Sequence, residues 1–230
     1  MRLFLIRHAQ TPANVAGELD TAPPGAGLTA LGRIQAAAVA ETLGRETVAG
    51  VYASPLRRTQ LTAEPLARSH RTDVVVQPGL EEVRAGDLEM RADEEAVAAY
   101  LGTLAGWMLG DLDRRMPGSH DGHAFLERYD AAVRAIADGH DAHETVAAFS
   151  HGAAIRTWSA IRVAGLDAHA VTERRVMNTG AVVLDGDPDR GWRLERWSSE
   201  PLGGADLADR AAHDVTGDGA DEAMAEADRR

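Results

Sequence analysis

Short apolar runs alternate with longer helix-forming segments through most of this chain, and this alternation restricts its fold more than any other feature. The expected strands cover residues 3–6, 48–53, 73–77, 145–149, 181–184 and 192–197. The expected helices cover residues 29–43, 54–68, 93–109, 123–138 and 152–163. Strands that alternate with helices form a mostly parallel sheet with helices on both faces. We therefore predict an α/β three-layer sandwich with a mostly parallel central sheet.

Residues 91–141 interrupt this alternation, because two expected helices follow one another there without a strand between them. We interpret this segment as a small helical cap inserted over the C-terminal edge of the sheet, although packing on a flank is equally compatible with the sequence. The predicted organisation is one α/β domain over residues 1–204. An acidic tail over residues 205–230 follows it.

The tail consists mainly of Ala, Asp, Glu and Gly, with eight acidic and three basic side chains. Segments of low hydrophobicity and high charge cannot bury enough apolar surface to order themselves. We therefore expect the tail to be mobile or weakly helical and to extend into solvent.

Composition excludes several classes of function. The chain has 230 residues, of which 44% are hydrophobic, enough for one large domain with its own core. A net charge of −12 disfavours nucleic acid and anionic membranes as partners. The absence of cysteine excludes a disulfide framework, thiolate zinc ligands and a cysteine nucleophile. No apolar run approaches the roughly 18 residues of a membrane span, and the apolar start is too short for a signal peptide, so we expect a soluble cytoplasmic protein.

The first expected strand ends abruptly in Arg7-His8. Open α/β sheets bind their ligands at the C-terminal ends of strands. An arginine beside a histidine can hold a phosphoryl group in line with a nitrogen nucleophile. Thr11 and Asn14 follow and add neutral donors for the same oxygens. A polar loop without a catalytic role is the alternative reading of this segment alone.

Three other strand ends carry charged or titratable side chains, as the first one does. Arg57 and Arg58 lie in the first turn of an expected helix, where cations oppose the helix dipole, so a bound anion would offset that cost. Glu81 and Glu82 follow the third strand, and His151 lies between the fourth strand and its helix. Together with Arg7-His8, these groups form a complete set for phosphoryl transfer.

In this set His8 is the expected nucleophile. Arg7, Arg58 and His151 would neutralise the phosphoryl oxygens as charge spreads in the transition state. Glu82 would protonate the leaving oxygen and then deprotonate the incoming water. Neighbouring arginines should lower the pKa of His8 and keep it neutral for attack. We expect no metal and no cofactor, because the cations supply the charge that magnesium supplies elsewhere.

The chain resembles the histidine phosphatase superfamily, also called the phosphoglycerate mutase-like family. The resemblance rests on five motifs in order over residues 1–184: Arg7-His8-x-x-Thr11-x-x-Asn14, Leu28-Thr29-x-x-Gly32-x-x-Gln35-Ala36, Ser54-x-Leu56-x-Arg58-x-x-x-Thr62-Ala63, Glu82 with Gly86, and Ser150-His151-Gly152. It implies a phosphohistidine intermediate on His8 and an acid/base role for Glu82. It also implies that Thr11, Asn14 and the backbone N–H of Gly152 are secondary phosphate contacts.

Neighbouring residues compete for two of these roles. The spacing to Gly86 favours Glu82 over Glu81 as the acid. Arg57 and Arg58 are about 100° apart on a helix, so they cannot face one pocket equally, and the family spacing selects Arg58. Two histidine pairs, His120-x-x-His123 and His140-x-x-His143, are compatible with a metal site, but histidines are common at helix ends and in loops.

We predict a metal-independent phosphomonoesterase of the histidine acid phosphatase type that acts on a small phosphorylated metabolite. One alternative is a phosphotransferase of the phosphoglycerate mutase type, which the short segment between Glu82 and His151 disfavours. Another is a phospho-ligand binding protein without turnover. The loop at 117–123 lacks the family's usual Gly-Glu-Ser pattern, so the substrate stays open. The resemblance also implies a possible homodimer.

Overall fold

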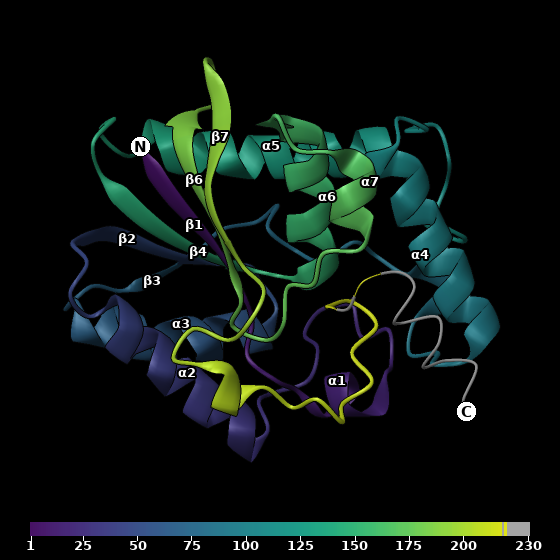
Figure 1. Cartoon of the computed structure of the whole chain (residues 1–230), viewed down its shortest axis with the longest axis horizontal. Coiled ribbons are helices and arrows are strands. Elements are labelled where there is room, and N and C mark those ends of the chain that lie inside the picture. Colours follow the sequence, from purple (N-terminus) through teal and green to yellow (C-terminus); the bar gives the residue numbers. More distant parts are fainter. Residues whose placement is uncertain (218, 220–230) are drawn as a thin grey trace.

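The computed structural model describes residues 1–217 and residue 219. It contains one seven-stranded sheet in the order β3-β2-β4-β1-β6-β7-β5 (Figure 1). The strands are β1 Arg2–Arg7, β2 Val48–Ala53, β3 Val74–Val76, β4 Thr145–Ser150, β5 Val163–Ala164, β6 Ala181–Asp187 and β7 Gly191–Ser198. β6 runs antiparallel to both of its neighbours, and the other pairings are parallel. The predicted mostly parallel sheet is confirmed, and β5 is a short addition to the expected strands.

Helices cover both faces of this sheet. They are α1 Pro12–Ala16, α2 Ala30–Leu43, α3 Arg57–Ser69, α4 Glu94–Met108, α5 Gly122–Asp138, α6 Gly152–Arg162 and α7 Ala168–Thr172. Two short 3-10 turns, Gly86–Leu88 and Ala205–Leu207, complete the described elements. The expected helices therefore lie where the sequence predicts them, within a few residues at each end.

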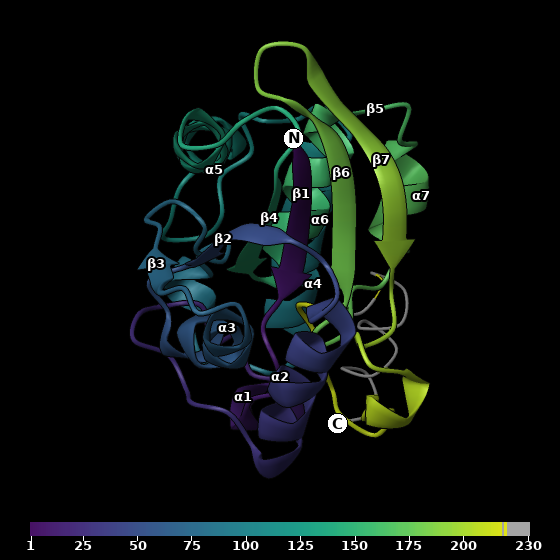
Figure 2. The ribbon, with the colours of Figure 1, turned by 90° about the vertical axis from the view of Figure 1, so that its left-hand side faces the viewer.

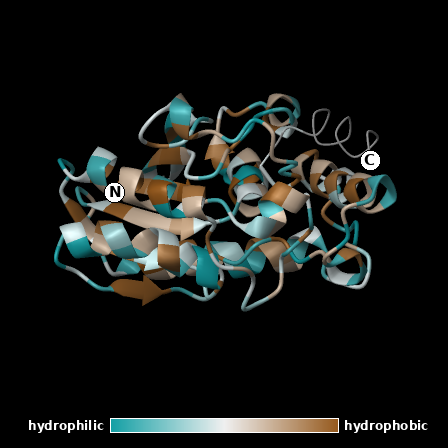
Figure 3. Ribbon diagram, turned by 90° about the horizontal axis from the view of Figure 1, so that it is seen from below, coloured by the Kyte–Doolittle hydropathy of each residue, from teal (hydrophilic) through white to brown (hydrophobic). Residues whose placement is uncertain are grey.

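The alternation of β1 explains the three layers. Leu3 and Leu5 face a core that also contains α4, α5 and α6. Phe4 and Ile6 face the opposite core, which α2 and α3 complete. In Figure 3 the strands are coloured mainly as hydrophobic, whereas the helices carry both hydrophobic and hydrophilic residues. The chain thus buries both faces of its sheet, as parallel sheets require.

The inserted segment contains the two expected helices, and α5 packs directly on the sheet. Phe125, Tyr129 and Ile136 of α5 share the core of Leu3 and Leu5 from β1. Helix α4 lies beside α6 and α7. Of the two positions that the sequence left open, α5 therefore takes the one on a flank of the sheet.

The start of α3 differs from the prediction. The sequence suggested Ser54 as the N-cap with Pro55 in the first turn, but the helix begins at Arg57 and Leu56 occupies the N-cap without a side-chain hydrogen bond. The hydroxyl of Ser54 instead contacts His151, so a tertiary partner displaces the local capping role.

The parallel register brings the strand ends together. Arg7 pairs with Ser150, and Ala53 pairs with Phe149. The residues that follow these pairs are His8, His151 and Ser54, and they leave the sheet at the same edge. Figure 2 shows β1 running toward α1 and the C-terminal segment at this edge.

Part of the predicted mobile tail packs against the domain. Leu207 accepts a hydrogen bond from the side chain of Gln35, at 2.8 Å, and Asp214 pairs with Arg7. The expectation of a solvated extension therefore does not describe this part of the tail, because Leu207 and Asp214 bond to Gln35 and Arg7 of the domain. For residues 218 and 220–230 the prediction lies outside the described residues. In the part of the chain that the structure describes, no helix is long and apolar enough to cross a membrane.

Candidate active site

Two buried histidines form the centre of the site. His8 follows β1, and His151 is the N-cap residue of α6. Their ring centroids are 5.2 Å apart, and their side chains are almost inaccessible to solvent. The structure therefore brings together two residues that are far apart in the sequence.

The hydrogen bond of His8 fixes its tautomer. Its Nδ1 lies 2.8 Å from the carbonyl oxygen of Ala9. Because a carbonyl oxygen can only accept, Nδ1 carries the proton, and Nε2 keeps its lone pair. Burial lowers the pKa of His8 well below its ordinary value, and the positive charges of Arg58 and Arg7 lower it further. His8 is thus a neutral imidazole with a nucleophilic nitrogen available.

A chain of hydroxyl groups orients His151. Its Nε2 lies 2.8 Å from Oγ of Ser54, which lies 2.9 Å from Oγ1 of Thr59. Thr59 donates to the carbonyl oxygen of Leu56, at 2.7 Å, so each hydroxyl accepts from the group before it. It follows that Nε2 of His151 is the donor in this chain.

The other ring nitrogen of His151, Nδ1, is buried and has no hydrogen-bond partner among the described residues. Burial lowers the pKa of His151 well below its ordinary value, and the nearby charge of Arg58 adds to this. The ring is therefore neutral in this structure. A bound phosphate dianion would favour the cation by supplying the opposite charge.

The carboxylate of Glu82 accepts hydrogen bonds from backbone N–H groups at the N-terminus of α6. Its Oε1 accepts from the backbone N–H groups of Ala154, at 2.8 Å, and Val83, at 2.9 Å, and its Oε2 accepts from Ala153 at 3.3 Å. Burial raises the pKa of this carboxyl despite these hydrogen bonds and the charge of Arg58. A carboxyl whose pKa is raised can hold a proton for a leaving group.

Glu81 lies in a different setting. It forms an ion pair with Arg128, 3.0 Å apart. The turn after the two carboxylates contains Gly86, which has a φ of +60°, and a Cβ there would clash with the carbonyl oxygen of Pro117. The structure thus separates the neighbouring glutamates, and only Glu82 reaches the N-terminus of α6.

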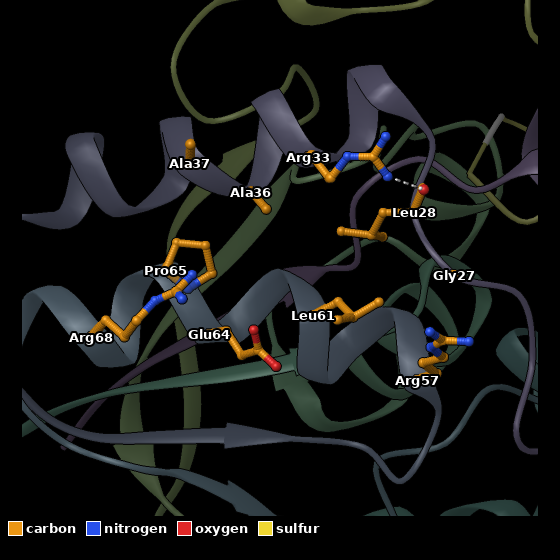
Figure 4. A pocket seen from close by; sticks show the side chains of 10 residues that line it. All are labelled: Gly27, Leu28, Arg33, Ala36, Ala37, Arg57, Leu61, Glu64, Pro65 and Arg68. Carbon is orange, nitrogen blue, oxygen red and sulfur yellow. Dashed lines mark hydrogen bonds between the residues drawn. The ribbon is translucent and has the colours of Figure 1, made fainter.

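The neighbouring arginines also diverge. Nη2 of Arg58 donates to the carbonyl oxygen of Asp20, at 2.8 Å, and Nη1 lies 3.5 Å from the carboxylate of Asp20. Its Nε is buried without a hydrogen-bond partner among the described residues. Arg57 instead lines a cavity of about 560 Å³ between α2 and α3, together with residues such as Leu61 and Arg68 (Figure 4).

Arg7 is fully buried, and the C-terminal segment holds it. Its Nη1 and Nη2 donate to the two carboxylate oxygens of Asp214, each at 2.5 Å. Nη2 also donates to Oγ1 of Thr216 at 2.9 Å, and Nη1 donates to the carbonyl oxygen of Val176 at 3.0 Å. Sequence reasoning missed Asp214 and Thr216, because no motif distinguishes them from the other polar residues of the tail.

The three predicted secondary contacts have different surroundings. Thr11 is the N-cap of α1 and forms a reciprocal capping box with Asn14. The side-chain amide of Asn14 donates to Oδ1 of Asp214 at 3.0 Å. Gly152 is the first residue of α6, and the carbonyl group of Thr216 lies against it.

One histidine of each of the two pairs has a protein partner. Nε2 of His123 lies 3.1 Å from Asp113, and His140 lies between Tyr52 and Glu144, 2.9 Å from each. In residues 1–217 and 219, no group of three or more His, Asp or Glu side chains is arranged to hold a metal ion.

A family model and two curated relatives match most of this chain. The family model of the histidine phosphatase superfamily (branch 1) matches residues 3–200. The probable phosphoglycerate mutase GpmB of Proteus mirabilis is 30% identical over 213 residues, which cover 88% of this chain and 93% of that protein. The PE-PGRS family protein PE_PGRS11 of Mycobacterium tuberculosis is 38% identical over 216 residues. This match covers 88% of the present chain but only 37% of that longer protein.

Solved structures with the same fold include phosphatases. The mycobacterial glucosyl-3-phosphoglycerate phosphatase in complex with VO3 superposes with a TM-score of 0.73 at 27% identity, over 86% of this chain and 99% of that one. The alpha-ribazole phosphatase of Shigella flexneri gives a TM-score of 0.67 at 25% identity, over 89% and 98% of the two chains. The family match and the fold agree: this chain belongs to the histidine phosphatase superfamily, branch 1.

Proposed function

We propose that the protein is a metal-independent phosphomonoesterase that transfers a phosphoryl group to His8 and then to water. The observation that carries this proposal is the state of His8. Its Nδ1–H is bound to the carbonyl oxygen of Ala9, its pKa is lowered, and two arginines and a second histidine surround it. This is the arrangement that a nitrogen nucleophile needs to attack phosphorus at neutral pH.

In the first step, Nε2 of His8 attacks phosphorus and the bond from phosphorus to the ester oxygen breaks. Glu82 gives its proton to that oxygen, so the alcohol leaves neutral. Arg7, Arg58 and His151 neutralise the negative charge on the other phosphoryl oxygens. The arginines carry this charge themselves, which is why the proposal includes no metal.

In the second step, the Glu82 carboxylate takes a proton from water. The resulting hydroxide attacks the phosphoryl group, the bond from phosphorus to Nε2 breaks, and inorganic phosphate leaves. His8 and Glu82 then return to their starting protonation states, so one turnover consumes one ester and one water.

A small phosphorylated metabolite is the substrate class that we propose. The names of the similar proteins support this, because they include phosphatases of glucosyl-3-phosphoglycerate and of alpha-ribazole. The burial of the site also favours a small phosphate ester over a phosphoprotein, whose reacting residue would have to enter with its backbone attached.

The name of the Proteus mirabilis relative supports a second candidate, a phosphoglycerate mutase. The two activities can be separated with 3-phosphoglycerate. A phosphatase releases inorganic phosphate, whereas a mutase returns the phosphoryl group to the other hydroxyl. Isomerisation faster than hydrolysis would favour the mutase.

The proposal is tested by phosphate release from a panel of metabolite phosphates, with chelator present and vanadate as an inhibitor control. We expect His8→Ala to lower kcat by about 10⁴-fold or more, because the nucleophile is removed. The matched control is His143→Ala, since His143 is exposed, and it should retain full activity. Equal turnover by His8→Ala and the wild type, or loss of activity in chelator, would contradict the mechanism.

A further inference from the structure

The proposed catalytic residues are closed off from solvent in this structure. Arg7, His8, Arg58, Glu82 and His151 are each 2% exposed or less. A phosphate ester cannot reach Nε2 of His8 until a covering segment moves. The segment that contacts the phosphate-binding side of the site is the C-terminal one.

We propose that residues 209–217, termed the plug, autoinhibit the enzyme by placing the Asp214 carboxylate on the donors that bind the substrate's phosphoryl group. This inference rests on the proposed function and adds regulation to the same site. Substrate and plug would then compete for one set of donors.

The contacts of Asp214 match those assigned to the phosphoryl group. Both of its oxygens accept from the guanidinium of Arg7, and Oδ1 also accepts from the side-chain amide of Asn14 at 3.0 Å. A carboxylate that accepts a bidentate arginine pair presents two oxygens in the same way as a phosphoryl group does. Arg7 and Asn14 therefore cannot serve both anions with the same atoms.

The backbone of the plug follows the same surface. The carbonyl group of Thr216 lies so close to Gly152 that a Cβ on Gly152 would overlap it. Gly217 approaches Arg7 closely, since a Cβ on Gly217 would overlap Nη1. The plug thus covers all three of Arg7, Asn14 and the N-terminus of α6.

The attachment of the plug is mainly polar. Within residues 209–217, the buried hydrophobic side chains are Ala212 and Val215. The other contacts are hydrogen bonds such as Gln10 to Asp209 at 2.8 Å and the Val176 N–H to Gly217 at 2.9 Å. Because few apolar side chains hold the plug, its release does not require unfolding of the domain, and an incoming phosphoryl group would replace the carboxylate that Arg7 loses.

Two polar groups remain for an incoming phosphoryl group while the plug is bound: an N–H donor on Arg58, and a ring nitrogen of His151 that becomes a donor when the phosphoryl group favours the cation. Nε of Arg58 and Nδ1 of His151 are buried and have no hydrogen-bond partner among the described residues. Binding there would bring a second anion close to Asp214, and the two negative charges would repel each other. The phosphoryl group would then complete its contacts by taking Arg7 from Asp214.

The test is Asp214→Asn in the full chain, with Asp206→Asn as the matched control. Asp206 lies in the same tail and is exposed, so the control makes the same charge change outside the plug. We expect Asp214→Asn to lower KM for p-nitrophenyl phosphate, and the Kd of inorganic phosphate, by about 10- to 100-fold, the range of a hydrogen bond to a charged group. Asp206→Asn should change neither constant by more than about twofold.

A second measurement follows the plug itself. Inorganic phosphate added to the wild type should speed hydrogen exchange at the Val176 amide, because that amide donates to Gly217 of the plug. If Asp214→Asn does not fold, Thr216→Ala serves in its place, since it removes one contact to Arg7 and leaves the carboxylate. Its expected decrease in KM is smaller, about threefold to tenfold.

Unchanged or weaker phosphate binding by Asp214→Asn would contradict the proposal that the plug autoinhibits the enzyme. A fall in kcat with unchanged KM would also contradict it, and would show that Asp214 instead positions Arg7 for catalysis. Phosphate binding is measured without turnover, for example by calorimetry. If Asp214→Asn binds phosphate more tightly but neither it nor the wild type turns over substrate, autoinhibition by the plug is supported and the proposed phosphatase activity is rejected. The failure of one proposal can therefore be told from the failure of the other.

Discussion

Arg7 and Arg58 act on the same histidine, yet the chain secures them in different ways. Arg58 lies in the first turn of α3, and its guanidinium is held by Asp20, mainly through a backbone carbonyl. Arg7 ends β1, and its guanidinium is held by a carboxylate 207 residues away in the sequence. One arginine is therefore positioned by the folded domain, and the other is occupied by the C-terminal segment. Under the proposal, the part of the site around Arg58 therefore stays fixed, whereas Arg7 exchanges Asp214 for the phosphoryl group.

Of the effects that compare the two arginines, the largest tests whether the contribution of Arg58 to the reaction is independent of the plug. Arg58→Ala should lower kcat/KM by about 10²- to 10³-fold, because it removes a cation from the developing charge. The factor should be the same in the wild type and in the Asp214→Asn background, since the plug does not contact Arg58 through any hydrogen bond among the described residues. The assay is the initial rate of phosphate release in the four variants of this cycle.

Arg57→Ala is the matched control for that cycle, because Arg57 lies in the neighbouring position but lines the cavity between α2 and α3. It should leave kcat/KM within about twofold of the wild type. An equal loss in both arginine variants would mean that the first turn of α3, and not the Arg58 guanidinium, is what the reaction needs.

A smaller effect, on KM, tests the part of the site around Arg7 and Asn14. Asn14 donates to Asp214 in the closed structure and is proposed to donate to the phosphoryl group once the plug leaves. In the Asp214→Asn background, Asn14→Ala should raise KM by about tenfold, the value of one hydrogen bond to a charged group. In the wild type the rise should be only about twofold to threefold, because the substitution also weakens the plug. Equal factors in the two backgrounds would show that Asn14 does not link plug and substrate.

The smallest effect concerns stability. His8 and His151 are held neutral by burial, with pKa values lowered well below the ordinary 6.5. Below about pH 6.5 the unfolded chain binds protons that the native site does not, so the free energy of unfolding falls as pH decreases. Each histidine contributes a slope of about 1.4 kcal/mol per pH unit at a pH where it is protonated in the unfolded chain and neutral in the native one.

Urea denaturation between pH 7.5 and 5.5 measures this slope. His151→Gln should make the slope shallower by the contribution of one histidine, because its pKa is lowered in the native state. A steep slope that survives in His151→Gln would place the titrating groups outside the site.

The strand ends explain why much of the site was predictable. Hydrophobic runs located β1 and β4, and their parallel register places Arg7 beside Ser150, so His8 and His151 had to emerge at one edge. The same reasoning could not foresee that Ser54 would bind His151 in place of capping α3, because local and tertiary partners compete for one hydroxyl.

The C-terminal segment shows where prediction from the sequence ends. Asp214 is one of eight acidic residues in the tail, and composition describes all eight alike. Its pairing with Arg7 depends on where the chain returns after β7, which no local pattern encodes. The tail was therefore predicted to be mobile or weakly helical, although Asp209 accepts a hydrogen bond from Gln10, and Asp214 and Thr216 accept hydrogen bonds from Arg7.

The most direct test of the account is to identify the residue that carries the phosphoryl group during turnover. The enzyme is mixed with excess p-nitrophenyl phosphate, quenched in alkali, where phosphohistidine is stable, and analysed by peptide mass spectrometry. The account predicts one phosphoryl group on the peptide that contains His8, located on His8 itself, and none in His8→Ala. A phosphoryl group on another residue, or active turnover that never labels His8, would contradict it.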